Sequence, residues 1–146
     1  MVKTYYDPQA CVDDSKKILA QLKPPYDAIL AVARGGLSFA HLLSQGLDLR
    51  TVFTVNVASY DETVQRDSVL IEALPDLSLC KRILIVEDII DSGKSMVALT
   101  QLIEETYPTL DYEVAALFYK QTALYKPNYY ANIADSWIDF YWEVDL

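Results

Sequence analysis

Acidic side chains follow a short apolar run in residues 83–95, which read ILIVEDIIDSGKS. Glu87 and Asp88 are adjacent where the run ends, and Asp91 comes three residues later, directly before Ser-Gly-Lys-Ser. Carboxylates in this position can bind the vicinal hydroxyls of a sugar around a Mg²⁺ ion, and a small polar turn that opens a helix can bind a phosphate through its backbone N–H groups. The spacing therefore indicates a site for a ribose that carries a 5′-phosphate.

Residues 91–95 supply what a cup for a single phosphate needs. Gly93 allows the backbone to approach an anion closely. The hydroxyls of Ser92 and Ser95 add hydrogen bonds to those of the N–H groups, and Lys94 lies between them in the sequence. A plainer interpretation stays open, in which the acids form a solvated strand end and Ser92 is an ordinary helix N-cap.

The ending Gly-Lys-Ser also matches the end of a nucleotide-binding P-loop. That motif needs a first glycine five positions before Gly93, where this chain has Asp88. A carboxylate there would point negative charge at the phosphates. Since the chain has only 4 glycines, none of the others completes a P-loop, and we set this interpretation aside.

The composition limits the class of protein. With 146 residues, 52% of them hydrophobic, the chain suits one domain over residues 1–146 with its own core. A net charge of −9 argues against a nucleic-acid partner. The single histidine, His41, nearly rules out Ser-His-Asp, Cys-His and His-rich zinc sites. Neither a membrane span nor a signal peptide is evident, so we expect a cytoplasmic protein without a membrane partner.

The apolar patterns predict strands and helices in alternation around the acidic segment. We expect helices over 8–22, 37–47 and 92–107, strands over 26–33, 51–58, 82–87 and 112–119, and an extended tail over 136–146. Residues 59–80 are interpreted as a long loop with a short strand over 69–73, and such loops are often lids. The alternation predicts an α/β fold with a mainly parallel central sheet flanked by helices, whose ligands bind at the carboxyl ends of the strands.

Several segments, in order along the chain, resemble the type I phosphoribosyltransferases, most of all the 6-oxopurine branch with its xanthine-guanine and hypoxanthine-guanine enzymes. VEDIIDSGKS (86–95) resembles their motif for phosphoribosyl diphosphate (PRPP), and AVARGGL (31–37) their pyrophosphate loop. SYDETVQR (59–66) is similar to the start of their mobile loop, and SWIDFYWE (136–143) to the hood over the base. LFYK and YKPNYY, which end at residues 120 and 130, are similar to the purine-contacting segment. The implied fold is that of a type I phosphoribosyltransferase, with a mobile loop over about 59–80 and a small C-terminal hood over about 120–146.

The resemblance also implies a reaction. A 6-oxopurine (guanine, xanthine or hypoxanthine) attacks C1 of PRPP, pyrophosphate leaves, and a nucleoside 5′-monophosphate forms, as in purine salvage. Mg²⁺ is the implied cofactor, with Glu87, Asp88 and Glu143 as its protein ligands, partly through PRPP and water. We also expect a homodimer or a homotetramer.

On the PRPP side, Arg34 and Gly35 match the loop that binds pyrophosphate, and the peptide bond after Arg34 can be cis in the family. Ser59 and Tyr60 match the dipeptide that closes over pyrophosphate, and Arg66 would add charge on closure. A tight turn and an ordinary surface loop are the alternatives for these two segments. The implied PRPP-binding set is completed by Glu87, Asp88, Asp91, Ser92, Gly93, Lys94 and Ser95.

On the purine side, Asp91 matches the general base or acid at N7, and Lys120 the lysine that donates to O6, which favours 6-oxo over 6-amino purines. These two are the implied catalytic residues. Trp137 matches the aromatic residue that stacks on the base, and Ile138 would offer main-chain groups to its edge. The alternatives are a helix-capping role for Asp91 and an exposed strand-end lysine at position 120.

Departures from the family patterns leave the base preference open. Glu87 and Lys94 follow the hypoxanthine-guanine type, whereas Tyr141 occupies a position where the xanthine-guanine pattern has proline. Two other functions also stay open: a regulatory protein that kept the fold and lost catalysis, and a phosphoribosyltransferase for another base. The net charge of −9 disfavours the first, and Lys120 with the hood disfavours the second.

Overall fold

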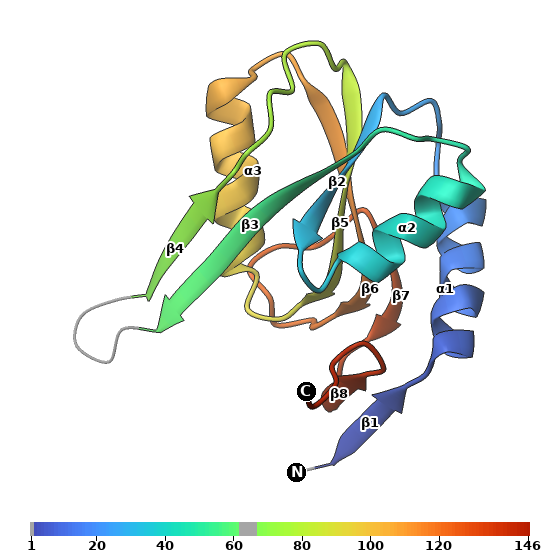
Figure 1. Cartoon of the computed structure of the whole chain (residues 1–146). Helices are drawn as coiled ribbons and strands as arrows, with labels where there is room; N and C mark the ends of the chain where they lie inside the picture. The colour runs from blue at the N-terminus through green and yellow to red at the C-terminus, as the bar shows by residue number, and fades with distance from the viewer. Residues whose placement is uncertain (1, 62–66) are drawn as a thin grey trace.

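The computed structural model describes residues 2–61 and 67–146, and only the backbone of residues 59–61 and 67 (Figure 1). Its elements are β1 (Lys3–Tyr6), α1 (Pro8–Gln21), β2 (Ala28–Ala33), α2 (Leu37–Gly46), β3 (Val52–Asp61), β4 (Asp67–Glu72), β5 (Arg82–Ile90), α3 (Lys94–Thr106), β6 (Asp111–Tyr119), β7 (Tyr129–Ile133) and β8 (Trp137–Phe140). No helix in the described part of the chain is long and apolar enough to cross a membrane.

Six of the strands form a central sheet in the order β4-β3-β2-β5-β6-β7. All neighbours are parallel except β3 and β4, which pair antiparallel. The mainly parallel sheet expected from the sequence is therefore confirmed. The carboxyl ends of β2, β5, β6 and β7 reach the same edge, the lower one in Figure 1.

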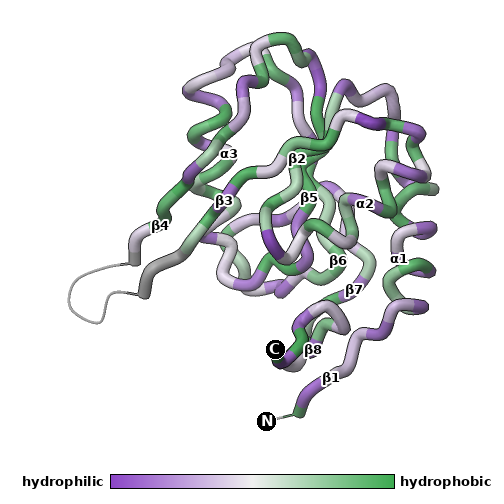
Figure 2. Tube along the Cα trace, in the orientation of Figure 1, coloured by the Kyte–Doolittle hydropathy of each residue, from purple (hydrophilic) through white to green (hydrophobic). Residues whose placement is uncertain are grey.

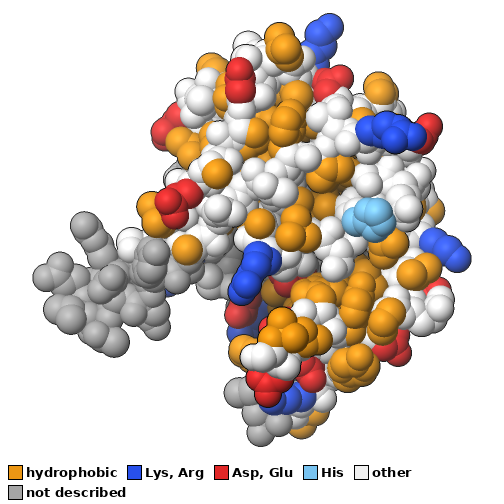
Figure 3. Space-filling model, in the orientation of Figure 1, with side chains coloured by type: hydrophobic (Ala, Val, Ile, Leu, Met, Phe, Trp, Pro, Cys, Tyr) orange, Lys and Arg blue, Asp and Glu red, His pale blue; other side chains and the backbone are white. Residues whose placement is uncertain are grey.

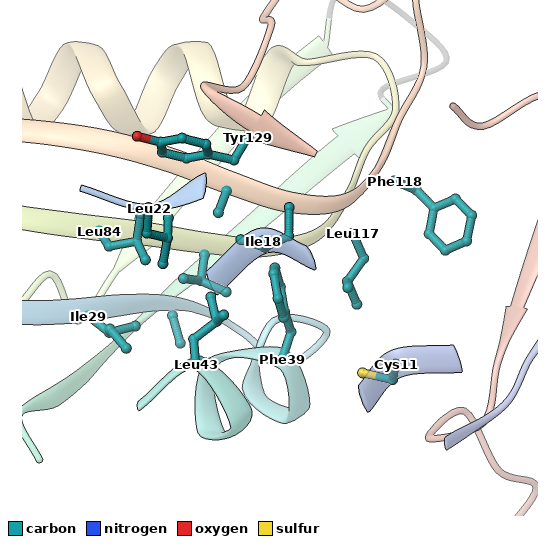
Figure 4. Packing of buried hydrophobic residues seen from close by; sticks show 14 of the residues in the cluster. Cys11, Ile18, Leu22, Ile29, Phe39, Leu43, Leu84, Leu117, Phe118 and Tyr129 are labelled. Carbon is teal, nitrogen blue, oxygen red and sulfur yellow. The ribbon is translucent and has the colours of Figure 1, made fainter. Parts of the chain in front are cut away.

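Helices cover both faces of this sheet, α1 and α2 on one face and α3 on the other (Figure 1). On β5, Leu84 packs with Ile18 of α1 and Phe39 of α2 (Figure 4), whereas Ile85 packs with Leu99 of α3. A strand buried on both faces requires an unbroken apolar run, and the tube around β2 and β5 is accordingly green in Figure 2. The apolar run before Glu87 is thus the centre of the core.

Several boundaries differ from the expected ones. The three helices are confirmed to within two residues at each end. β5, however, continues to Ile90 instead of ending at Glu87, because Ile89 and Ile90 keep pairing with β6. The short strand expected over 69–73 is present as β4 (Asp67–Glu72), but the long loop expected around it over 59–80 is wrong in part. β3 runs on to Asp61 because it pairs antiparallel with β4, and the two strands project from the sheet in Figure 1.

A second, two-stranded sheet joins the two ends of the chain. β1 pairs with β8 in parallel, and the pair lies below the carboxyl edge of the central sheet in Figure 1. Sequence reasoning gave an extended tail at β8 but missed β1 and β7. β1 has only four residues, three of them exposed, so its sequence KTYY carries no alternation of apolar and polar residues.

Candidate functional site

Glu87 and Asp88 lie near the carboxyl end of β5, where the core strand meets the edge of the sheet. The Asp88 N–H donates to Glu87 Oε1 at 2.9 Å, and the Ile89 N–H donates to Asp88 Oδ1 at 2.6 Å. Burial, and next to it the charge of Asp88, raises the pKa of the Glu87 carboxyl well above its ordinary value. Burial also raises the pKa of Asp88, although its hydrogen bonds act in the opposite direction.

Such a pair fits a hard cation. Two neighbouring carboxylates that are withdrawn from water are stabilised as anions by a divalent ion with oxygen ligands. No group of three or more His, Cys, Asp and Glu residues among 2–61 and 67–146 could hold a metal ion by itself. A Mg²⁺ ion at Glu87 and Asp88 would therefore take further ligands from substrate and water.

The turn after β2 lies against these acids because β2 and β5 are neighbours. A Cβ atom on Gly35 would collide with the Asp88 carboxylate, and one on Gly36 would lie 2.6 Å from the Val86 carbonyl oxygen. Gly36 thus requires glycine because backbone atoms crowd it, and Gly35 lets the turn lie directly against the Asp88 carboxylate. Arg34 at the start of the turn is exposed. The cis peptide bond is the one before Arg34, between Ala33 and Arg34, and not the one after it as the family resemblance implied.

The turn between β5 and α3 has the form of an anion site. Gly93 is the N-cap of α3 with φ +85° and no side-chain cap, so Ser92 is not the ordinary N-cap residue. Ser92 Oγ instead accepts a bond of 3.3 Å from the Lys94 N–H. Gly93 itself has no side chain to cap the helix, and the positive end of the helix dipole favours an anion in front of this turn.

Residues 124–125 support this turn from behind, which the sequence did not indicate. The Leu124 N–H donates to the Ser92 carbonyl oxygen at 2.8 Å. A Cβ atom on Gly93 would lie 2.7 Å from the Tyr125 nitrogen and 2.8 Å from the Leu124 nitrogen. Position 93 thus requires glycine for two reasons: its left-handed φ and the two backbone nitrogens that lie close to it.

A cavity of about 290 Å³ opens beside this turn. Its polar lining comes from the acidic segment and the turn, and its apolar lining from β2, β3, β5 and α3. The lining residues are Val32, Val57, Glu87, Ile89, Ile90, Asp91, Ser92, Gly93, Ser95, Met96 and Leu99. Glu87, Asp91, the serine hydroxyls and the start of α3 therefore share one concave site.

The structure brings the two residues expected to act in catalysis together. Lys120 Nζ lies 3.5 Å from Asp91 Oδ1, with side chains 53% and 67% exposed. They meet because β6 is parallel to β5, and the Lys120 N–H donates to the Ile90 carbonyl oxygen at 3.0 Å. An ion pair this exposed stabilises the fold little, so both groups stay available to a ligand.

The remaining predicted residues lie on or after β8, or their side chains lie outside the described residues. Trp137, 55% exposed, and Ile138, buried, lie on β8 opposite Lys3 and Thr4. Glu143 is exposed just after β8, and its N–H donates to the Phe140 carbonyl oxygen at 2.9 Å. The side chains of Ser59 and Tyr60, and the whole of Arg66, lie outside the described residues.

Comparisons with known proteins agree with this arrangement. A family model for the phosphoribosyl transferase domain matches residues 1–146. Xanthine-guanine phosphoribosyltransferase of Idiomarina loihiensis is 32% identical over 126 residues, which cover 83% of this chain and 73% of that protein. The enzyme of the same name from Cereibacter sphaeroides is 34% identical, over 82% of this chain and 70% of its own length.

Solved structures give the same result. The xanthine-guanine-hypoxanthine phosphoribosyltransferase of Helicobacter pylori superposes with a TM-score of 0.90 at 33% identity, over 98% of this chain and 95% of that one. A purine phosphoribosyltransferase from Pyrococcus horikoshii gives 0.84 at 28% identity, over 100% and 97% of the two chains. The chain therefore belongs to the phosphoribosyl transferase domain family and, within it, to the 6-oxopurine branch of the type I enzymes.

Proposed function

We propose that this protein transfers the 5-phosphoribosyl group of PRPP to a 6-oxopurine, namely guanine, xanthine or hypoxanthine, and releases pyrophosphate and a nucleoside 5′-monophosphate. The observation that carries the proposal is the contact between Lys120 and Asp91 beside the glycine turn that begins α3. It supports a purine and a ribose phosphate bound side by side. The names of the similar enzymes support the choice of base class.

The PRPP end of the reaction is assigned to the turns at the sheet edge. The N–H groups at the start of α3 and the hydroxyls of Ser92 and Ser95 would bind the 5′-phosphate. The backbone of Arg34 and Gly35, joined by the Arg34 charge, would bind pyrophosphate. Mg²⁺, held next to Glu87 and Asp88 through PRPP and water, would offset the charge of the leaving pyrophosphate.

Three further residues complete the proposed PRPP site. Ser59, Tyr60 and Arg66 would close over pyrophosphate, which would keep water from the reacting ribose. Glu143 is proposed as a ligand at a second Mg²⁺ site.

The purine end is assigned to β6, β8 and the acid after β5. As N9 of the base bonds to C1 and the bond from C1 to pyrophosphate breaks, Asp91 would accept the proton of N7. The Lys120 ammonium would donate a hydrogen bond to O6. A purine with an amino group at C6 could not accept that bond. Trp137 would stack on the ring, and the main chain of Ile138 would bind its edge.

Pyrophosphate release tests this function. The protein is incubated with Mg²⁺ and PRPP and with guanine, xanthine, hypoxanthine or adenine in parallel, and once without Mg²⁺. We expect turnover with at least one 6-oxopurine, none with adenine, and none without the ion. Binding of PRPP without turnover on any base would instead favour a regulatory protein of the same fold.

The cellular location and the oligomeric state are proposals from the sequence. We propose that the enzyme works in the cytoplasm, which cell fractionation tests. We also propose a homodimer or a homotetramer, and light scattering on the purified protein distinguishes these from a monomer.

A further inference from the structure

Asp14 on α1 is a buried carboxylate that the proposed reaction does not use. It is 6% exposed. Its Oδ2 accepts one hydrogen bond of 2.8 Å from the Tyr6 hydroxyl and a second of 2.8 Å from Asn132 Nδ2, while Lys17 Nζ lies 3.5 Å from Oδ1. Burying a carboxylate is unfavourable unless its oxygens are hydrogen-bonded, so these partners are held in a defined geometry.

The first partner, Tyr6, belongs to the small sheet that carries the predicted base-stacking residue. Tyr6 is the last residue of β1 and pairs with Phe140 of β8, in the same ladder that pairs Lys3 with Trp137. Its ring, 4% exposed, meets Phe118 edge-on at 5.0 Å and Phe140 at 5.7 Å. The bond to Asp14 therefore ties the β1–β8 sheet to α1.

The second partner, Asn132, belongs to the central sheet. It lies on β7, where it pairs with Phe118 of β6, and its Nδ2 also donates to the Leu117 carbonyl oxygen at 3.2 Å. β6 leads directly to Lys120. One carboxylate oxygen thus connects β7, the neighbour of the strand that leads to Lys120, with β1, the partner of the strand that contains Trp137.

The two sheets have no strand ladder in common within the described residues. A short link, residues 134–136, joins β7 to β8, and the Ala134 N–H donates to the Tyr119 carbonyl oxygen at 2.9 Å. Side chains add the Asp14 bonds and the ring contacts of Phe118 with Tyr6 and Phe140. Figure 4 shows Phe118 at the end of the labelled core side chains, and Figure 3 shows hydrophobic side chains gathered below α2 toward β8 and β1. Aromatic contacts hold the two sheets together, but a hydrogen bond is more directional and restricts their angle.

We propose that Asp14 is a positioning residue for the purine subsite, which sets through Tyr6 and Asn132 how far the base-stacking Trp137 lies from Lys120. The inference rests on the proposed function. It predicts a larger effect on the purine than on PRPP, because the PRPP turns follow β2 and β5, and only Glu143, just after β8, belongs to the sheet that Asp14 would position.

The test compares variants at both ends of one hydrogen bond. Asp14→Ala removes the acceptor, Asp14→Asn keeps a carbonyl oxygen in its place, and Tyr6→Phe keeps the ring and loses only the hydroxyl. The matched control is Tyr26→Phe, which removes the hydroxyl of another buried tyrosine and with it a bond of 2.7 Å to Glu113 Oε1. KM for purine, KM for PRPP, kcat and Tm are measured for each.

We expect Asp14→Ala and Tyr6→Phe to raise the KM for purine by about five- to tenfold, the scale of one lost hydrogen bond, with the KM for PRPP within about twofold of the wild type. Asp14→Asn should recover most of the loss. Tyr26→Phe should lower Tm and leave both KM values unchanged. If Asp14→Ala does not fold, the two KM values of Tyr6→Phe decide whether the hydrogen bond positions the purine subsite.

Two results would overturn the inference in different ways. An active wild-type enzyme whose Tyr6→Phe variant keeps its KM for purine, or changes both KM values together, would make Asp14 a purely structural residue. A wild type that turns over none of the 6-oxopurines would overturn the proposed function, and this inference with it.

Discussion

Replacing Gly93 by alanine tests whether residues 124–125 fix the phosphate turn. A side chain at φ +85° costs about 1–2 kcal/mol. The added methyl would also lie 2.7 Å and 2.8 Å from two backbone nitrogens, which cannot move as a flexible side-chain end could. Overpacking of this kind costs about 1–3 kcal/mol more. A loss of about 2–5 kcal/mol in a domain of about 150 residues lowers Tm by about 4–20 °C.

Calorimetry and kinetics check this value, with Gly46→Ala as the control. Gly46 is the last residue of α2, and a methyl there would meet only the end of the flexible Leu19 side chain, so we expect a small change in Tm. In Gly93→Ala the KM for PRPP should also rise, because the N–H groups of the turn are displaced. A Gly93→Ala variant with wild-type Tm and wild-type KM for PRPP would refute the reasoning.

Three other changes probe single groups. Asp91→Asn should lower kcat about a hundredfold or more while PRPP binding, measured by titration calorimetry, changes little; an unchanged rate would remove Asp91 from proton transfer. Lys120→Ala should reduce kcat/KM for 6-oxopurines by about 10–100-fold with PRPP still bound, and full activity would contradict the O6 contact. Asp27 accepts hydrogen bonds from the Arg82 and Lys81 N–H groups, and these bonds lower the pKa of its carboxyl from the ordinary value of 3.8. The charged form therefore stabilises the fold above that pH, and the stabilisation is lost as the pH falls through the lowered pKa. Asp27→Asn should therefore lower Tm at pH 7, and the difference from wild type should shrink below about pH 4; a difference independent of pH would exclude the charge as its cause.

The acidic segment was predictable because its pattern is local. An apolar run of core residues has to be a buried strand, and the sequence after it has to leave the sheet at the carboxyl edge, where parallel strands place ligands. The point where the strand ends was not predictable in the same way. Glu87 and Asp88 look like the start of a loop, yet Ile89 and Ile90 pair with β6 and keep the segment extended.

Long-range contacts account for what the sequence did not reveal. β1 has four mostly exposed residues and exists because β8, more than a hundred residues later, pairs with it. Asp14 looks like a solvated acid on a helix, and only the folded chain places Tyr6 and Asn132 next to it. The same holds for Leu124 behind Gly93, since nothing in the segment 120–126 indicates a contact with the turn after β5.

A chain with a net charge of −9 must overcome repulsion to bind a substrate with several phosphates. Charges on the far surface matter little, because salt screens them beyond about 8–10 Å. The groups at the site act over short distances: the positive end of the α3 dipole, the amides of two glycine turns and the ammonium of Lys120. Beside them, burial raises the pKa of both Glu87 and Asp88, and the charge of Asp88 adds to the rise at Glu87. A divalent ion would therefore relieve the repulsion of the protein and of the substrate at once. The acidity of this site is therefore compatible with an anionic substrate, and we expect binding to depend on the ion more than on the overall charge.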